Sequence, residues 1–283
     1  MKSVDVNGVQ LAYDVTGAGE PVLFISPVVA DGFLPLVAEP VLADHHLLIR
    51  YHKRGWAGST HTPPPVTVAD HAADAAALLD RLGVRRAHVV GHSTGASAAA
   101  QLALDHPGCV HTLTLMEPEV MGLPSGKAFL EQARPVFEAY GNGDPAGALV
   151  MFMEAVSGLD RATCEALFER RVPGAIAQAV EDADTCFGIE LPALTQWEFG
   201  VEQAAAVHRP TLSVRGAETL PFFVDVAGFL RESLPDVEET VIDGVGHLLQ
   251  IQRPEPVARA VAGFLDRHPL EPSLSVAGGM LDV

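Results

Sequence analysis

The chain has few basic residues and no long apolar run. Its 283 residues include 18 Lys and Arg against 36 Asp and Glu, which gives a formal net charge of −18. Nucleic-acid phosphates and anionic membrane surfaces are bound chiefly by Lys and Arg, so this balance argues against both kinds of partner. No apolar stretch reaches the ~18 residues of a membrane-spanning helix. The N-terminal residues also lack the apolar core of a signal peptide.

Cysteine is scarce as well. The three cysteines are an odd number and lie far apart, so they match neither a disulfide framework nor a metal-binding pattern. The 12 histidines show no paired spacing typical of a zinc site. We therefore expect a cytoplasmic protein with reduced thiols, and we expect neither a metal ion nor another cofactor.

A strand–turn–helix pattern organises what is present. The apolar run Ala87–Val90 leads into Gly91–Gly95, which reads G-H-S-T-G, and a helix-favouring run of small residues follows. Such a turn is so tight that the positions two before and two after its serine must lack side-chain bulk. The pattern predicts that Ser93 is a nucleophile. It also predicts that the backbone N–H of Thr94, at the start of a helix, stabilises an oxyanion.

Strand-like and helical stretches alternate along the rest of the chain, which predicts a mostly parallel sheet with helices on both faces. We assign this core to residues 1–118 and 209–269. Residues 119–208 contain helical windows and no convincing strand, so we expect an inserted helical lid there. The helical windows are Lys127–Tyr140, Pro145–Val156, Arg161–Arg171, Ala175–Ala183 and Pro192–Val207. Residues 270–283 lack either period and are expected to form a C-terminal tail. The expected core strands and helices are Val4–Asn7, Gln10–Val15, Pro21–Ser26, His46–Tyr51, Ala87–Val90, Val110–Met116, Pro210–Arg215 and Glu238–Ile242, and Phe33–Ala43, Thr67–Leu82, Phe222–Leu234 and Pro254–Asp266.

A serine hydroxyl is too weakly acidic to attack a carbonyl unaided, so a base must lie within hydrogen-bond reach. His247 is our candidate. It follows the Gly-rich turn Gly244–Gly246, between the last predicted strand and the closing helix. With an ordinary pKa near 6.5, a histidine is mostly neutral at pH 7 and can accept the proton.

Taken together, these patterns resemble the α/β-hydrolase family over about residues 3–267. The resemblance rests on Gly91–Gly95, on His247 and on the order of the strands. It implies an α/β-hydrolase fold and a serine hydrolase that forms an acyl-enzyme without a metal or cofactor. It also implies a second oxyanion donor in the loop after Pro21–Ser26. The usual His-Gly is missing there, but the backbone N–H of Val28 could serve.

The identity of the triad acid is left open by the same resemblance. The family usually has an aspartate in the turn after Pro210–Arg215, where this chain has Thr219. A second known position is the end of the strand after the nucleophile helix, and there Glu117 follows the serine by 117 − 93 = 24 residues. We expect Glu117 to be the acid, with Glu218 as the alternative and Asp243 as a further candidate.

Short motifs also bear on the substrate. The run Ser93–Ser97 and the position of Glu117 are similar to those of fungal zearalenone lactonases, members of the same family, which favours an ester or lactone over a peptide. A predicted lid with apolar side chains and few basic residues indicates a small, neutral, hydrophobic substrate. The candidate pocket residues are Met121, Met153, Trp197 and Leu248.

Two other classes of function remain open. The same serine could perform cyclisation, transacylation, C–C cleavage or perhydrolysis, or the chain could be a binder that kept the pocket. The pairing of Ser93 with His247 argues against a binder, which has no need for a nucleophile on a strained turn. We expect a small-molecule substrate as partner and a monomer or homodimer.

Overall fold

A computed structural model describes residues 1–270, so nearly all of the predicted tail lies outside the described residues. Within them, eight strands form one sheet in the order β1-β2-β4-β3-β5-β6-β7-β8. Strands β4, β3, β5, β6, β7 and β8 are mutually parallel, and β2 runs antiparallel to β1 and β4. The predicted mostly parallel sheet is thus confirmed. The strands are β1 Lys2–Val6, β2 Val9–Gly17, β3 Glu20–Ile25, β4 His46–Tyr51, β5 Ala87–His92, β6 Val110–Met116, β7 Thr211–Gly216 and β8 Val237–Ile242.

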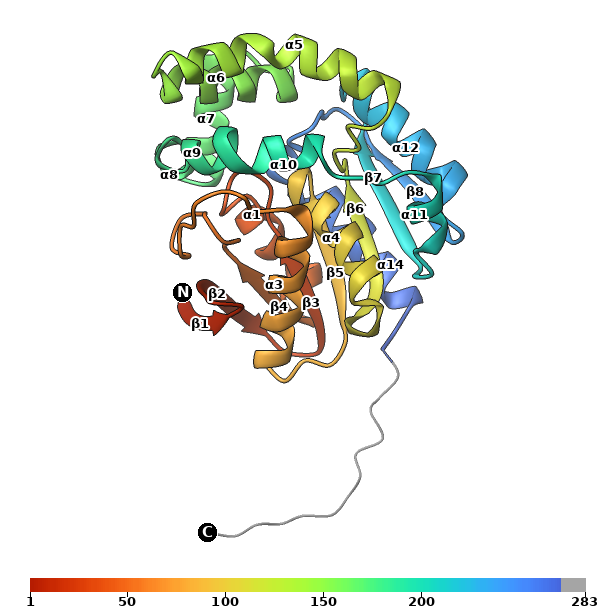
Figure 1. Cartoon of the computed structure of the whole chain (residues 1–283). Helices are drawn as coiled ribbons and strands as arrows, with labels where there is room; N and C mark the ends of the chain where they lie inside the picture. The colour runs from red at the N-terminus through yellow and green to blue at the C-terminus, as the bar shows by residue number, and fades with distance from the viewer. Residues whose placement is uncertain (271–283) are drawn as a thin grey trace, which may run out of the picture.

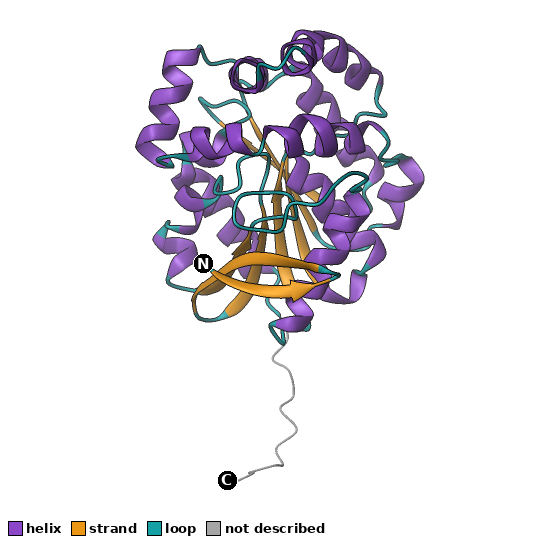
Figure 2. Ribbon diagram, turned by 60° about the vertical axis from the view of Figure 1, so that its left-hand side comes forward, coloured by secondary structure: helices purple, strands orange, loops and turns teal. Residues whose placement is uncertain are grey.

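The central strands are buried on both faces. Every residue of β5 is buried, as are the last four of β3 and the last five of β6. Parallel strands covered by helices on each side read as continuous apolar runs, which explains why the sequence shows no alternation there. Figure 2 shows helices on both sides of the sheet. The core helices are α3 Val68–Arg81, α4 Thr94–Asp105 and α12 Pro221–Ser233 in one apolar cluster, and α1 Leu34–Val37, α2 Pro40–Ala43 and α14 Pro254–Arg267 in the other.

The ends of α3 follow the expected capping chemistry. The Thr67 hydroxyl accepts a hydrogen bond from the Asp70 N–H, and the Asp70 carboxylate accepts one from the Thr67 N–H. This reciprocal arrangement satisfies backbone donors that the first turn leaves free. Gly83, with φ of 70°, follows the end of the helix. The predicted helix Thr67–Leu82 is therefore confirmed to within one residue at each end.

The expected helix Phe33–Ala43 is wrong as a single element. The chain forms two four-residue helices, α1 and α2, with an extended Glu39 (ψ 126°) between them. Pro40 explains the break. Proline has no N–H to donate to a preceding turn, and its ring disfavours helical backbone at the residue before it.

The segment between β6 and β7 is helical and lies above the carboxyl ends of the strands (Figure 1). The predicted helical window Pro192–Val207 is wrong, because it contains two helices, α10 and α11, with irregular chain up to Gly200 between them. Whether this insert opens and closes as a lid stays a prediction. Its elements are α5 Pro124–Gly141, α6 Pro145–Ser157, α7 Arg161–Arg171, α8 Ala175–Glu181, α9 Ala183–Thr185, a π-helical turn Cys186–Glu190, α10 Leu191–Thr195 and α11 Val201–Ala206.

Two short elements complete the described chain. A 3₁₀ turn, Pro107–Cys109, precedes β6, and α13, Leu249–Gln252, precedes α14. No helix in residues 1–270 combines the length and the apolarity that crossing a bilayer requires.

Candidate active site

Ser93 stands on a strained turn between β5 and α4. Its backbone has φ 54° and ψ −125°, a conformation that residues with a side chain rarely adopt. A Cβ atom on Gly91 would lie 2.4 Å from the Gly95 carbonyl oxygen, and one on Gly95 would lie 2.1 Å from the Ile25 carbonyl oxygen. The expectation that both positions exclude side chains is thus confirmed. The reason is steric, since each glycine lies directly against neighbouring backbone.

Three side chains from distant parts of the sequence form a continuous chain of hydrogen bonds. His247 Nε2 lies 3.1 Å from Ser93 Oγ, and His247 Nδ1 lies 2.6 Å from Glu117 Oε2. All three residues are buried. The Phe223 ring of α12 stacks on the imidazole at 4.2 Å between ring centres, with 12° between the planes. This packing fixes the ring so that one nitrogen faces the hydroxyl and the other faces the carboxylate.

Glu117 follows β6 directly, with φ of 46°. Its carboxylate also accepts hydrogen bonds from the Gly216 N–H at 2.8 Å and from the Thr219 hydroxyl at 2.9 Å. Thr219, which stands where the family has its usual aspartate, therefore donates to Glu117. The alternative acids Glu218 and Asp243 are exposed, and neither is among the hydrogen-bond partners of His247 in residues 1–270.

His92 supports His247 through the backbone, a role that the sequence did not indicate. The Gln250 side-chain amide lies 3.0 Å from His92 Nδ1, and His92 Nε2 lies 2.8 Å from the His247 carbonyl oxygen. Because Nδ1 accepts from the amide, Nε2 carries the proton and donates to the carbonyl. Complete burial and the nearby His247 hold the pKa of His92 well below its usual value, so the ring stays neutral.

A second carboxyl group, that of Glu119, contacts the serine. Glu119 Oε1 lies 3.0 Å from Ser93 Oγ, and the side chain is fully buried. Burial raises the pKa of Glu119 to about 7. Glu119 is the first residue of the insert, and no local pattern in the sequence indicated a role for it. Only its distance of two positions from Glu117 could have drawn attention to it.

A buried ion pair connects the insert to the turn that carries Ser93. The Lys53 ammonium, after β4, contacts the Glu190 carboxylate in the insert and donates to the Thr94 hydroxyl at 2.9 Å. The Trp56 indole N–H also donates to Glu190. Burial works to raise the pKa of Glu190, but the Lys53 and His71 charges together with side-chain hydrogen bonds outweigh it and hold that pKa below its usual value.

Both predicted oxyanion donors belong to segments next to Ser93 in the fold. Thr94 is the first residue of α4, where helix N–H groups have no acceptor within the helix. Val28 is buried in the loop after β3. Strand β3 lies between β4 and β5, so the chain reverses direction across the sheet at this point, which is where α/β sheets bind ligands. The oxyanion roles of both N–H groups stay predictions.

The four predicted pocket residues are not gathered in one described cavity. Trp197 donates its indole N–H to Gln101 Oε1 at 2.8 Å and lines a surface cavity that does not include Ser93. Met153 lines a small cavity between α6 and α7. Met121 packs in the apolar core, and Leu248 is buried directly after His247. Their roles in substrate binding stay predictions.

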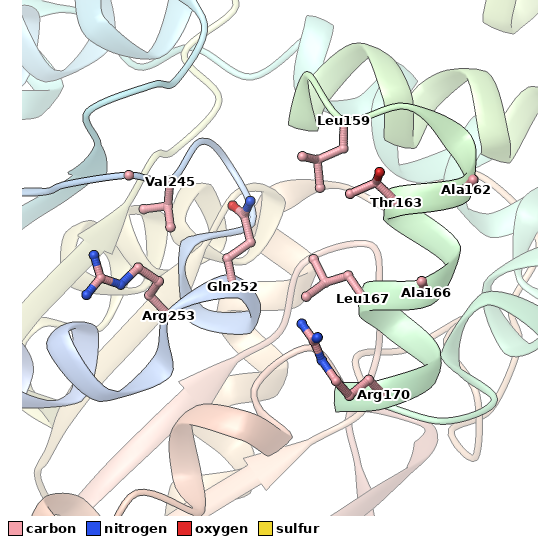
Figure 3. Close-up of a pocket in the computed structure, with 10 residues that line it drawn as sticks. Leu159, Ala162, Thr163, Ala166, Leu167, Arg170, Val245, Gln252 and Arg253 are labelled. Carbon is pink, nitrogen blue, oxygen red and sulfur yellow. The ribbon is translucent and has the colours of Figure 1, made fainter.

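Another cavity, of about 560 Å³, lies between α7 and the loop that precedes His247. Figure 3 shows Thr163, Leu167 and Arg170 of α7 facing Val245 and Gln252 across it. None of the triad candidates lines this cavity, so we do not assign the reacting group of a substrate to it. In residues 1–270 no three His, Cys, Asp or Glu side chains are grouped so that they could hold a metal ion.

Comparison with known proteins gives both a family match and individual relatives. The family model described as alpha/beta hydrolase fold matches residues 29–254. A fluoroacetate dehalogenase from Burkholderia sp. is 26% identical over 230 residues, which are 78% of this chain and 70% of that protein. The solved structure of Est816, titled an N-acyl homoserine lactone degrading enzyme, is 27% identical with a TM-score of 0.72, covering 93% of this chain and 100% of that one.

A third relative matches over a shorter segment. The dihydrolipoyllysine-residue acetyltransferase component of the acetoin cleaving system of Cupriavidus necator is 36% identical over 119 residues, or 42% of this chain. The match spans only 32% of the length of that protein. It therefore supports a shared segment and not a shared overall activity.

Proposed function

Because the chain belongs to the α/β hydrolase fold family, we propose that it is a serine hydrolase that cleaves small, hydrophobic esters or lactones. In this proposal Ser93 is the nucleophile, His247 is the base and Glu117 is the acid. The observation that carries it is the hydrogen-bond chain from Glu117 through His247 to Ser93. A nucleophile, its base and a group that orients the base are the three parts that acyl transfer requires.

The mechanism follows from these contacts. His247 accepts the Ser93 proton at Nε2 as Oγ attacks the carbonyl carbon, while Glu117 holds Nδ1 and stabilises the imidazolium. The N–H groups of Thr94 and Val28 hold the oxyanion. His247 then gives the proton to the leaving oxygen, which leaves an acyl-enzyme, and afterwards activates the water that releases the acid. No step requires a metal or cofactor.

Several features support the preference for a small, neutral substrate. Ser93 and His247 are only 2% and 3% exposed under the insert, so a bound acyl group would be shielded from water. The structurally similar Est816 is described as an N-acyl homoserine lactone degrading enzyme, which favours a cyclic or linear ester as the substrate of this chain too. Residues 119–208 would act as the lid over this site.

The proposal is tested by covalent labelling and turnover. A fluorophosphonate probe should label the wild-type protein, and Ser93→Ala should abolish labelling. The wild type should also hydrolyse p-nitrophenyl butyrate and γ-butyrolactone, with a loss of about 10⁶-fold in Ser93→Ala. The matched control is Ser233→Ala, at the end of α12, which should keep both properties.

Each failure has a distinct meaning. An unlabelled wild type would overturn the proposal and favour a binder. Labelling without any ester or lactone turnover would instead favour one of the non-hydrolytic acyl reactions.

A further inference from the structure

The proposed triad leaves one contact of Ser93 unexplained. Glu119 Oε1 lies 3.0 Å from Ser93 Oγ, about as close as His247 Nε2 at 3.1 Å. The backbone of Glu119 is fixed by α4, because its N–H donates to the Ser97 hydroxyl at 3.1 Å. The Glu119 backbone is thus anchored on α4 while its carboxyl group contacts Ser93, so the carboxyl group lies at the proposed reaction site.

The number of protons available at Ser93 determines whether the Glu119 carboxyl group must be protonated. The Ser93 hydroxyl has one proton and can donate it to only one acceptor at a time. When that acceptor is His247 Nε2, as the mechanism requires, the short contact with Glu119 needs a proton from Glu119 itself. The raised pKa of Glu119, about 7, is consistent with this protonated form. When Glu119 is ionised, the Ser93 hydroxyl donates to Oε1. When Glu119 is protonated, Oε1 donates to Ser93 Oγ, and Oε2 is left as a carbonyl oxygen that can only accept.

Among the described residues, Glu119 Oε2 is buried and has no hydrogen-bond partner. Buried polar atoms nearly always have a partner, and leaving one unpaired costs about 1–3 kcal/mol. Oε2 is bonded to the same carbon atom as Oε1, and Oε1 is the oxygen that contacts Ser93. An unpartnered acceptor therefore lies in the same carboxyl group that contacts the Ser93 hydroxyl.

The charges around Glu119 do not supply the missing donor. The Lys53 ammonium is already engaged by Glu190 and the Thr94 hydroxyl, and His247 uses both ring nitrogens in the triad. The charged or titratable groups that bear on the Glu119 carboxyl are His247, Glu190, Lys53 and Cys186.

We propose that Glu119 determines specificity, with Oε2 accepting a hydrogen bond from a hydroxyl or amide N–H that the substrate carries beside its scissile carbonyl. The substrate class is thereby narrowed to α-hydroxy or α-acylamino esters and lactones. This inference rests on the proposed function. Its physical basis is that a site with a buried polar group rejects an analogue that leaves this group unpaired.

The test compares three lactones that differ only at the carbon next to the carbonyl. These are γ-butyrolactone, α-hydroxy-γ-butyrolactone and α-acetamido-γ-butyrolactone, and acid release is followed in a pH-stat at pH 6.5. The wild type should favour at least one donor-bearing lactone over γ-butyrolactone by about 30-fold or more in kcat/KM. Glu119→Leu, which is close in volume but has no acceptor, should reduce that ratio to within about 3-fold.

Two further measurements keep the proposal open to refutation. The exposed Glu218→Gln should retain the wild-type ratio, which shows that loss of any nearby carboxylate is not enough. If Glu119→Leu does not fold, calorimetry on Ser93→Ala decides instead. Donor-bearing lactones should bind at least ~10-fold more tightly than γ-butyrolactone to this variant.

The outcomes separate this inference from the proposed function. Fluorophosphonate labelling and lactone turnover without any preference for a donor would overturn the role of Glu119 and leave the serine hydrolase intact. Absence of labelling and turnover would overturn the proposed function. The Ser93→Ala binding comparison would then still decide whether Oε2 selects a donor, and equal binding would refute it.

Discussion

Two glutamates only two positions apart, Glu117 and Glu119, meet the reaction site in opposite electrostatic environments. The Glu117 carboxylate accepts hydrogen bonds from a backbone N–H, a hydroxyl and the His247 ring. Among residues 1–270, the Glu119 carboxyl has one hydrogen-bond partner, Ser93, and one oxygen without a partner. Identical side chains are thus suited to the different tasks proposed for them, Glu117 to orient the His247 ring and Glu119 to recognise a substrate.

The difference arises from what borders each residue. Glu117 ends β6 beside the end of β7, where Gly216 and Thr219 turn their donors toward it. Glu119 is the first residue of the insert and lies near the buried Glu190, where burial dominates and raises the pKa of Glu119. A charged carboxylate needs such donors, and without them its proton is retained.

Within this comparison of the two glutamates, the largest expected effect is the loss of activity when Glu117 is replaced. Glu117→Gln should lower kcat/KM by about 10⁴-fold, because the amide can no longer hold His247 in the tautomer that accepts the serine proton. Steady-state kinetics on p-nitrophenyl butyrate measures this. The exposed Glu218→Gln should stay within about 2-fold of wild type. Loss of activity in Glu218→Gln alone would show that the triad acid has been misassigned.

The second prediction concerns the charge that borders Glu119. Glu190→Gln removes the partner of the buried Lys53 ammonium and should lower the free energy of unfolding by about 3–5 kcal/mol. Urea denaturation measures the change. As a control, Glu165→Gln breaks an exposed pair with Arg161 and should cost no more than about 0.5 kcal/mol. Equal effects of the two substitutions would mean that the buried pair does not tie the insert to the core.

The smallest effect should appear as a pH dependence. Folding raises the pKa of Glu119 from 4.5 to about 7, so between these values the folded chain keeps a proton that the unfolded chain releases. The free energy of unfolding therefore falls as the pH rises through this window. Relative to the wild type, Glu119→Gln should gain about 3 kcal/mol in stability between pH 4.5 and pH 7.5.

Urea denaturation at several pH values tests this third prediction. Glu165→Gln, on the exposed face of α7, should parallel the wild type throughout the range. A constant difference between wild type and Glu119→Gln would mean that Glu119 is as readily ionised in the folded chain as in the unfolded one. The contrast with Glu117 would then disappear.

Much of the core was predictable because it depends on local patterns. Apolar runs gave the buried strands, Gly91 and Gly95 marked a turn with no room for side chains, and Thr67 marked the start of α3. The two wrong helix predictions also concern local features of the chain. Pro40 splits the expected helix Phe33–Ala43, and the irregular chain before Gly200 separates α10 from α11. In both places hydrophobic periodicity outweighed backbone signals that were present in the sequence.

The amino-acid sequence by itself determined the fold class and the strained serine, since these follow from short-range sterics and periodicity. The three candidates for the triad acid, Glu117, Glu218 and Asp243, came from the resemblance to the α/β-hydrolase family. Only the tertiary structure placed the Glu117 carboxylate against the His247 ring, and only it brought Glu119, Lys53 and Glu190 to the same buried region. The reason is that a carboxyl group takes its charge and its role from the donors and the burial around it. Those neighbours come from β7, from the loop after β4 and from the insert, at sequence distances that no local pattern reports.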